Sequence, residues 1–352
     1  MSVSALQSRL SKGEAFLIIS PSNRFYLTDF ESSDGYLFIT RGSAVLLVDG
    51  RYYEAALSKA KNCSEIVLLR RASMQLRAFA DIEGIKKVYT ESAGISVSQL
   101  LELEKIYKCP VLPKKTDKEL CALRRVKTEE EKSRIISAQR IAESAFDHIL
   151  SFIKPGVTET DVRLELEYFM LRHGASSLSF ETIVVSGKKT SMPHGVPGDK
   201  KIESGDFVTM DFGAVYEGYH SDMTRTVAVG SVTDEMAKVY ETVLKAQEAC
   251  LDILAPGVSC RQADFAARQV ITNAGYGEYF THSTGHGVGV EIHERPNLSV
   301  RSKDILQPGD VVTDEPGIYM PGKFGVRIED MVYITENGCE DLTKSEKSLI
   351  IL

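Results

Sequence analysis

The sequence lacks the cysteine spacings of metal knuckles and disulfide scaffolds. Its six cysteines are scattered along the chain, and no two of them form a CxxC pair, so we expect reduced, structural thiols. A long apolar run is also missing from the opening segment, MSVSALQSRLSKGEAFLIIS. Because its apolar stretch is far too short for a signal peptide or a membrane span, a cytoplasmic protein without membrane contacts is expected.

An excess of positive charge is also absent. The formal net charge is -7, which leaves no basic footprint for nucleic acid or for an anionic membrane. The content of 43% hydrophobic and 26% charged residues is close to the globular average and excludes a disordered or fibrous chain. An ordinary folded protein is therefore predicted.

The length and the residue patterns predict two domains. A chain of 352 residues exceeds the usual size of one domain. β-branched runs that alternate with helical patterns indicate an α/β domain with strands at residues 36–40, 44–48, 65–69 and 86–90. Helices are expected from about Arg51 and from Ser96. A charged segment at 112–127 with prolines nearby is typical of a linker, which predicts domains at 1–115 and 116–352.

The second domain contains an internal repeat. The segment FIKPGVT around Pro155 recurs as ILAPGVS around Pro256, 101 residues later. The segment ESGDFVTMDFGAVY, with Gly205, recurs as QPGDVVTDEPGIYM, with the matching Gly309, 104 residues later. Because the two offsets are nearly equal, we expect an α+β domain of two duplicated half-domains related by a pseudo-twofold axis, with a site between the halves.

Acidic residues interrupt strands of this domain that are otherwise apolar. Strand alternation places Asp211 on one face of FVTMDFG, and a hairpin returns into a strand that carries Asp222. The 104-residue offset selects Glu315 rather than Asp314 as the counterpart of Asp211. The strand GVRIEDMVYIT then supplies Glu329. Four converging carboxylates repel one another in a partly buried site, so the sequence predicts a centre that holds two divalent metal ions.

Histidines also gather in the second domain. Four of the seven histidines in the chain lie there beside glycine or acidic residues: His194, His282, His286 and His293. Histidine is the commonest neutral nitrogen ligand and a natural proton carrier near pH 7. Metal ligands and catalytic partners are both expected in this set, although spacing alone does not assign the roles.

Six motifs in the second domain resemble those of one known group. They are PHG at Pro193, MDFGA at Met210, SDMTRT at Ser221, GHGVGVEIHE at Gly285, DEPGIY at Asp314 and GVRIED at Gly325. Together they resemble the Xaa-Pro aminopeptidase and prolidase group of pita-bread metallopeptidases. The segments SNRFYLTDF and DGRYYEAA are similar to the creatinase-type N-terminal domain of that group. The resemblance therefore implies a smaller α/β domain followed by a pita-bread catalytic domain.

The resemblance also implies the roles of individual residues. The implied metal ligands are Asp211, Asp222, His286, Glu315 and Glu329. They would bind two divalent ions, with manganese expected and cobalt, zinc or iron as alternatives, and a hydroxide between the ions would be the nucleophile. Glu315 would also act as general base and proton shuttle. His194 and His293 would stabilise the tetrahedral intermediate and hold the substrate. His282 and Arg327 would line the substrate pocket or support the ligands.

We therefore expect a homodimeric aminopeptidase that hydrolyses the N-terminal Xaa-Pro bond of small peptides. The main alternative is a prolidase, which cleaves only Xaa-Pro dipeptides and must recognise a free carboxylate. Some short prolidases and some aminopeptidases carry arginine after the H-E-x-P segment, where this chain has Asn297. This difference slightly favours the aminopeptidase.

Other members of the fold are weaker alternatives. Methionine aminopeptidase differs in the N-terminal domain and in the PHG and EIHE patterns, and creatinase-like amidinohydrolases work without the metal ligands that this chain retains. A more distant alternative is a metal-free peptide- or protein-binding module, which would have lost those ligands. For Arg327, a structural salt bridge with Glu329 is an interpretation as good as substrate contact.

Overall fold

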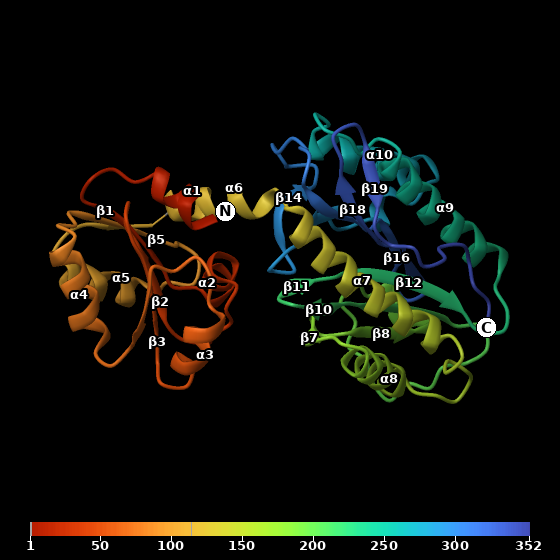
Figure 1. Ribbon diagram of the computed structural model, residues 1–352. Coiled ribbons are helices and arrows are strands. Elements are labelled where there is room, and N and C mark those ends of the chain that lie inside the picture. The colour runs from red at the N-terminus through yellow and green to blue at the C-terminus, as the bar shows by residue number, and fades with distance from the viewer. Residues whose placement is uncertain (1, 114) are drawn as a thin grey trace. The chain divides into compact units, whose positions relative to one another are not determined.

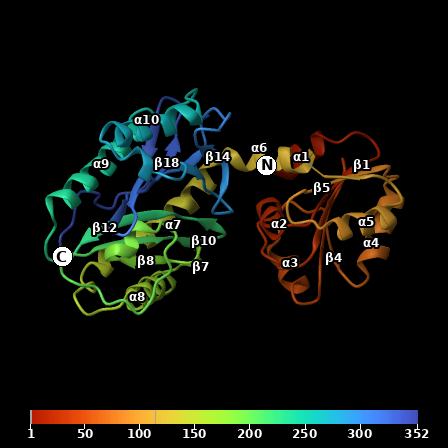
Figure 2. The same ribbon diagram turned by 180° about the vertical axis from the view of Figure 1, so that it is seen from behind.

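The computed structural model describes residues 2–113 and 115–352, and the chain divides into two compact units. The first unit comprises Met1–Arg124 and the second comprises Arg125–Leu352. Each unit combines helices with sheets (Figures 1 and 2). In the described part of the chain, no helix has both the length and the apolar sequence needed to cross a membrane.

The first unit is built on a six-stranded sheet with the order β4-β3-β2-β1-β5-β6. Its strands are β1 (Glu14–Ile18), β2 (Tyr36–Ile39), β3 (Ala44–Val48), β4 (Glu65–Leu68), β5 (Lys87–Thr90) and β6 (Val111–Leu112). Strand β1 pairs antiparallel with β2 and parallel with β5. The four strands expected from the sequence are confirmed as β2 to β5. The central strand β1 was not predicted, because its run EAFLI is buried on both faces and lacks polar alternation.

Helices cover both faces of this sheet (Figures 1 and 2). They are α1 (Ser2–Ser8), α2 (Pro21–Thr28), α3 (Tyr53–Lys59), α4 (Ala72–Ile82), α5 (Val97–Tyr107) and α6 (Lys115–Arg125). Phe16 and Ile18 join the core under α1, α2, α3 and α6, whereas Ala15 and Leu17 join the core under α4 and α5. The alternation of strand side chains therefore supplies two cores from one sheet.

The second unit begins with the helices α7 (Glu129–Ile149) and α8 (Glu159–Arg172). Capping boxes at Thr128 and Thr158 satisfy the first backbone donors of the two helices. The strands that follow are β7 (Ser177–Leu178), β8 (Ile183–Ser186), β9 (Phe207–Phe212), β10 (Ala214–Tyr216), β11 (Tyr219–His220) and β12 (Met223–Ala228), with a short 3₁₀ helix η1 (Gly187–Ser191) after β8. Val208, Met210 and Phe212 of β9 pack into the core against α7 and α8.

The second half of this unit repeats the plan. Two helices, α9 (Asp234–Leu251) and α10 (Cys260–Asn273), lie on the opposite side of the strands from α8 (Figures 1 and 2). After the 3₁₀ helix η2 (Gly277–Tyr279) come β13 (Gly285–Gly287), β14 (Glu294–Leu298), β15 (Val311–Asp314), β16 (Gly317–Met320), β17 (Phe324–Arg327), β18 (Asp330–Ile334) and β19 (Cys339–Asp341). The expected duplication of an α+β half-domain is confirmed.

The two halves meet through their acid-bearing strands. The backbone N–H of Glu329 donates to the carbonyl of Thr224 at 3.1 Å, which joins the β18 side to β12. Thr224 itself pairs with Asp211 across β12 and β9. Acids that are more than one hundred residues apart in sequence therefore come together where the halves join.

Candidate metal centre

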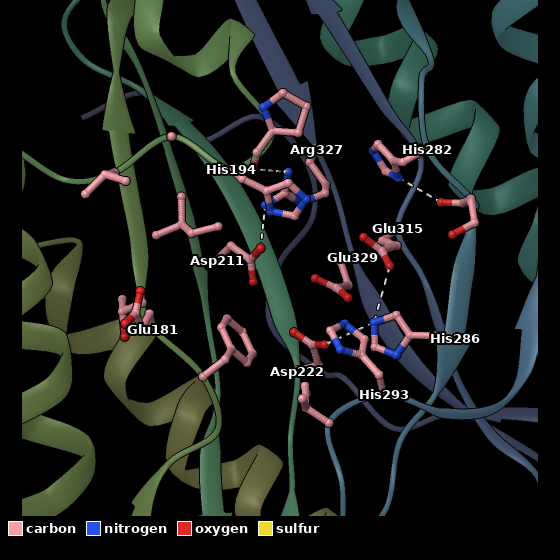
Figure 3. A pocket seen from close by; sticks show the side chains of 18 of the residues that line it. Glu181, His194, Asp211, Asp222, His282, His286, His293, Glu315, Arg327 and Glu329 are labelled. Atoms are coloured by element: carbon pink, nitrogen blue, oxygen red, sulfur yellow. Dashed lines mark hydrogen bonds and ion pairs between the residues drawn. The ribbon is translucent and has the colours of Figure 1, made fainter. Parts of the chain in front are cut away.

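Strand ends position the acidic side chains around one cavity. Asp211 lies near the end of β9, and Asp222 directly precedes the antiparallel β12. In the other half, Glu315 directly follows β15 and Glu329 directly precedes β18. All four line a cavity of about 600 Å³ (Figure 3). The four predicted carboxylates are thus in one place.

Asp314 and Glu315 lie on opposite sides of their strand. Glu315 lines the cavity, whereas Asp314 is fully buried and lies beside the thiol of Cys250 in the core of the second half. Successive side chains of an extended chain point to opposite faces, so only one of the two can reach the cavity. The repeat offset had selected Glu315, and the structure places that residue at the site.

His286 completes a compact set of ligand atoms. Its Nε2 lies 3.6 Å from Oδ2 of Asp222 and 3.5 Å from Oε1 of Glu315 (Figure 3). Asp222, His286 and Glu329 each offer a ligand atom within 4.8 Å of the others. Three donors at this spacing, with Glu315 beside them, can surround a cation.

Asp211 lies at the other edge of the cluster and is held by Arg327. The guanidinium Nη2 donates to Asp211 Oδ2 at 2.5 Å, and the same group bonds to Oγ1 of Thr224 through Nε at 2.9 Å. The second oxygen of Asp211, Oδ1, is buried without a hydrogen-bond partner among the described residues. The ion pair of Arg327 is with Asp211 rather than with Glu329, the partner suggested as one interpretation of the sequence.

Burial and mutual repulsion make the acids hard to ionise. Burial, followed by the charges of Asp211 and Glu315, raises the pKa of Asp222 well above its ordinary value. Burial and the charge of Asp222 do the same to the pKa of Glu329. Burial raises the pKa of Glu315 to about 8. Such a cluster carries its negative charge at neutral pH only when cations share the space.

The imidazole of His286 is also suited to bind a metal ion. Burial lowers the pKa of His286 to about 4, so the ring is neutral at pH 7 and keeps a lone pair available for a metal. Carboxylate oxygens with one imidazole form a donor set for hard or borderline divalent ions such as Mn²⁺, Co²⁺, Zn²⁺ or Fe²⁺. The buried, unbonded oxygen of Asp211 adds a further free donor. The residues therefore fit a metal centre.

The remaining predicted residues lie around the same cavity. His194, His282 and His293 line it together with Arg327 (Figure 3). The rings of His286 and His293 lie edge to face, with centroids 4.4 Å apart. His194 follows Pro193, whose carbonyl accepts a hydrogen bond from Arg327 at 3.3 Å. Every residue proposed for the site from the sequence is thus brought to one cavity.

Tyr319 is a site residue that sequence reasoning missed. Its hydroxyl lies 2.9 Å from Nε2 of His282 and accepts from Arg327 Nη1 at 2.8 Å. Because His282 Nδ1 lies 2.8 Å from the carbonyl of Ser283, Nδ1 carries the proton and Nε2 accepts from Tyr319. The motif DEPGIY contained this tyrosine, but nothing in its sequence context distinguishes it from a core aromatic residue.

A pair on α10 supports the loop before His286. Asp264 accepts from the backbone N–H of Thr284 at 3.2 Å and pairs with Arg268. Arg268 Nη2 donates to the carbonyl of His282 at 2.7 Å. These contacts hold the backbone that carries His282 and His286. They join residues that are too distant in sequence for a local pattern to predict.

Comparison with known proteins identifies the family. Residues 133–336 match metallopeptidase family M24, and residues 6–126 match the creatinase/prolidase N-terminal domain. An Xaa-Pro dipeptidase of Pyrococcus horikoshii is 40% identical, over 96% of this chain and 94% of the relative.

Two solved structures show the same architecture. An Xaa-Pro dipeptidase from Bacillus anthracis is 42% identical with a TM-score of 0.96, and the match covers 100% of this chain and 99% of that one. An X-Pro aminopeptidase from Thermotoga maritima is 36% identical with a TM-score of 0.92, covering 99% and 100%. The expected pita-bread domain, preceded by a creatinase-type domain, is confirmed. The chain therefore belongs to metallopeptidase family M24 and is a metallo-exopeptidase.

Proposed function

We propose that this enzyme is an Xaa-Pro dipeptidase, which hydrolyses the bond between a first residue and a C-terminal proline. The observation that carries the proposal is the compact set of Asp222, His286 and Glu329, with Glu315 beside it, in a cavity that also contains Arg327. Relatives that span nearly the whole chain are Xaa-Pro dipeptidases, from Pyrococcus horikoshii and Bacillus anthracis. They favour the dipeptidase over the aminopeptidase expected from the sequence.

The proposed centre holds two divalent ions, with manganese as the expected metal. The ligands would be Asp211, Asp222, His286, Glu315 and Glu329. Four carboxylates balance the charge of two divalent ions, which supports two ions rather than one. When bound, such ions lower the pKa of a water molecule and polarise the scissile carbonyl.

The side chains around the centre then supply the proton transfers. Glu315 is the general base: it takes a proton from the attacking water and returns it to the proline nitrogen, which leaves as an amine. His293, edge to face with His286, donates a hydrogen bond to the carbonyl oxygen as negative charge develops on it. Arg327 holds Asp211 in place.

A dipeptidase must also hold the carboxylate of proline. His194 lines the cavity, and its ring has no hydrogen-bond partner among the residues that the structure describes. The Asn297 amide lines the same cavity, likewise without a side-chain partner there. His282 is less suitable, because Tyr319 and Ser283 already engage both of its ring nitrogens. We therefore infer that His194 and Asn297 bind the carboxylate of the substrate proline.

The test is cleavage of methionyl-proline and of methionyl-prolyl-alanine by the manganese-loaded chain, with Asp222→Asn as the control. Cleavage of the dipeptide alone, lost in the control, supports the dipeptidase. Cleavage of both peptides would make the enzyme an aminopeptidase. Cleavage of neither, with metal bound, would refute the proline-specific reading.

The aminopeptidase stays the second candidate for two reasons. The X-Pro aminopeptidase of Thermotoga maritima covers the whole fold at 36% identity. The cavity also presents the neutral Asn297 where an arginine would strengthen the binding of a free carboxylate. A metal-free binding module is disfavoured by the full donor set, and metal analysis of the purified protein tests it. The homodimer and the cytoplasmic location stay predictions.

A further inference from the structure

Glu181 is a cavity carboxylate that lies apart from the metal cluster. It precedes β8 and lines the same cavity as the five proposed ligands. Figure 3 shows it on the far side of Asp211 and Asp222 from His286. The residue is exposed, and its carboxylate makes no hydrogen bond or ion pair within the described ranges of the chain. It therefore brings to the cavity wall an acidic side chain without an ionic partner among the described residues.

The charges of the cavity leave Glu181 uncompensated. Two divalent ions would balance the four ligand carboxylates. Arg327 is then the lining residue with a permanent positive charge, and it is committed to Asp211 at 2.5 Å. The net charge of the cavity around the proposed metal ligands thus becomes neutral to positive, which favours binding of the dipeptide carboxylate there. The cavity wall at Glu181 keeps its negative charge.

The chemistry of an Xaa-Pro dipeptide limits what can meet this charge. Proline brings only its ring and a carboxylate, which Glu181 would repel. The free amino group is one carbon from the scissile carbonyl, so it stays near the metal end. Only a long side chain on the first residue can carry a cation to a different wall of the cavity.

On the basis of the proposed function, we propose that Glu181 forms a subsite for a lysine or arginine side chain on the residue before proline. The aliphatic stem of such a side chain would lie along the apolar lining, which includes Phe180 and Ile183. The cationic end would pair with the carboxylate. Glu181 is thus a specificity residue and takes no part in bond cleavage.

The experiment compares lysyl-proline with norleucyl-proline, which has a similar stem without the charge. The manganese-loaded wild type and Glu181→Gln are each measured for kcat/KM on both dipeptides. In Glu181→Gln, loss of the ion pair between the substrate lysine and Glu181 should reduce the ratio of kcat/KM for lysyl-proline to that for norleucyl-proline about two- to fivefold. This is the effect of an ion pair at a partly exposed site, and it should arise mainly through KM. Glu278→Gln, an exposed acid outside the cavity, should leave the ratio unchanged.

The outcomes separate this proposal from the function on which it rests. An unchanged ratio in Glu181→Gln overturns the subsite while the dipeptidase stands. If the wild type cleaves none of the dipeptides, the proposed function fails. Calorimetric binding of the same two dipeptides to the wild type and to Glu181→Gln then decides the subsite: a lysyl preference lost in the variant supports it, and equal binding refutes it.

Discussion

Lys127 and Glu294 form a buried ion pair beneath the loop that carries His293. Lys127 Nζ lies 3.3 Å from Glu294 Oε2, and the side chains are 1% and 4% exposed. The other oxygen of Glu294 accepts from the backbone N–H of Glu291 at 3.0 Å. A Cβ at Gly289 would lie 2.6 Å from Glu294 Oε2, so glycine leaves room for the carboxylate. The pair thus fixes the loop from 289 to 294.

Removing the lysine charge should destabilise the second unit. Lys127→Met removes the cation that faces Glu294 Oε2 in this buried pair, and removing one partner of a buried ion pair costs about 3–5 kcal/mol. Urea unfolding of the metal-loaded protein measures the loss. The matched control, Lys127→Met with Glu294→Met, removes both charges and should recover most of the stability. A single variant as stable as the wild type would contradict a role for the pair.

Loss of a central ligand should remove the metal and the activity together. Asp222→Asn replaces a carboxylate that is only 4% exposed and within reach of His286 and Glu329. Loss of a residue that only supports a metal ligand lowers metal affinity by up to about a hundredfold. Loss of a ligand itself should therefore lower it by at least that much. Elemental analysis after dialysis, together with the peptide assay, checks this. The control is Glu235→Gln, an exposed acid outside the cavity, and retention of a full metal load by Asp222→Asn would refute the ligand assignment.

The metal-free protein should lose stability as the pH rises from about 4.5 to about 8. The pKa of Glu315 is raised from 4.5 to about 8 by burial, so the folded state holds a proton that the unfolded state has released. This contribution is complete below about pH 4.5 and is lost as the pH rises through about 8. His286, whose pKa is lowered to about 4, has the opposite effect only below about pH 6.5.

Thermal unfolding of EDTA-treated protein at pH 6.5 and pH 8.5 checks this dependence. We expect a lower Tm at the higher pH, and a smaller drop for Glu315→Gln, which has no proton to lose. Manganese should reverse the trend in the wild type, because ions bind the deprotonated carboxylates more tightly as the pH rises. A Tm of the EDTA-treated protein that rises with pH over this range would contradict the raised pKa.

The hydroxyl of Tyr319 should contribute to both stability and activity. Tyr319→Phe removes the donor to His282 and an acceptor of Arg327, and leaves the half-buried imidazole and the buried guanidinium partly unsatisfied. A stability loss of about 1–3 kcal/mol is expected for such groups. Arg327 also holds Asp211, so Tyr319 supports a proposed metal ligand indirectly. We therefore expect kcat/KM to fall about tenfold, which is the low end of the range for residues that support a metal ligand. Tyr333→Phe, outside the cavity, is the control, and equal kinetics for the two variants would count against the network.

Local periodicity in the sequence was enough to select acids that the structure brings to one cavity. Strand alternation and the 104-residue offset selected Asp211 and Glu315 from the chain alone, and they excluded Asp314. This worked because the side-chain period of a strand and the duplication of a half-domain are both written along the chain. The motifs likewise indicated the family, the two-domain plan and the histidines of the cavity.

Contacts between distant segments could be read only from the tertiary structure. The partner of Arg327 proved to be Asp211 instead of Glu329, and Tyr319 joined the site through a bond to His282. The free carboxylate of Glu181 has meaning only once the cavity is known. A sequence pattern specifies which face a side chain takes, but the packing of two half-domains decides which faces meet, and therefore which charges are paired.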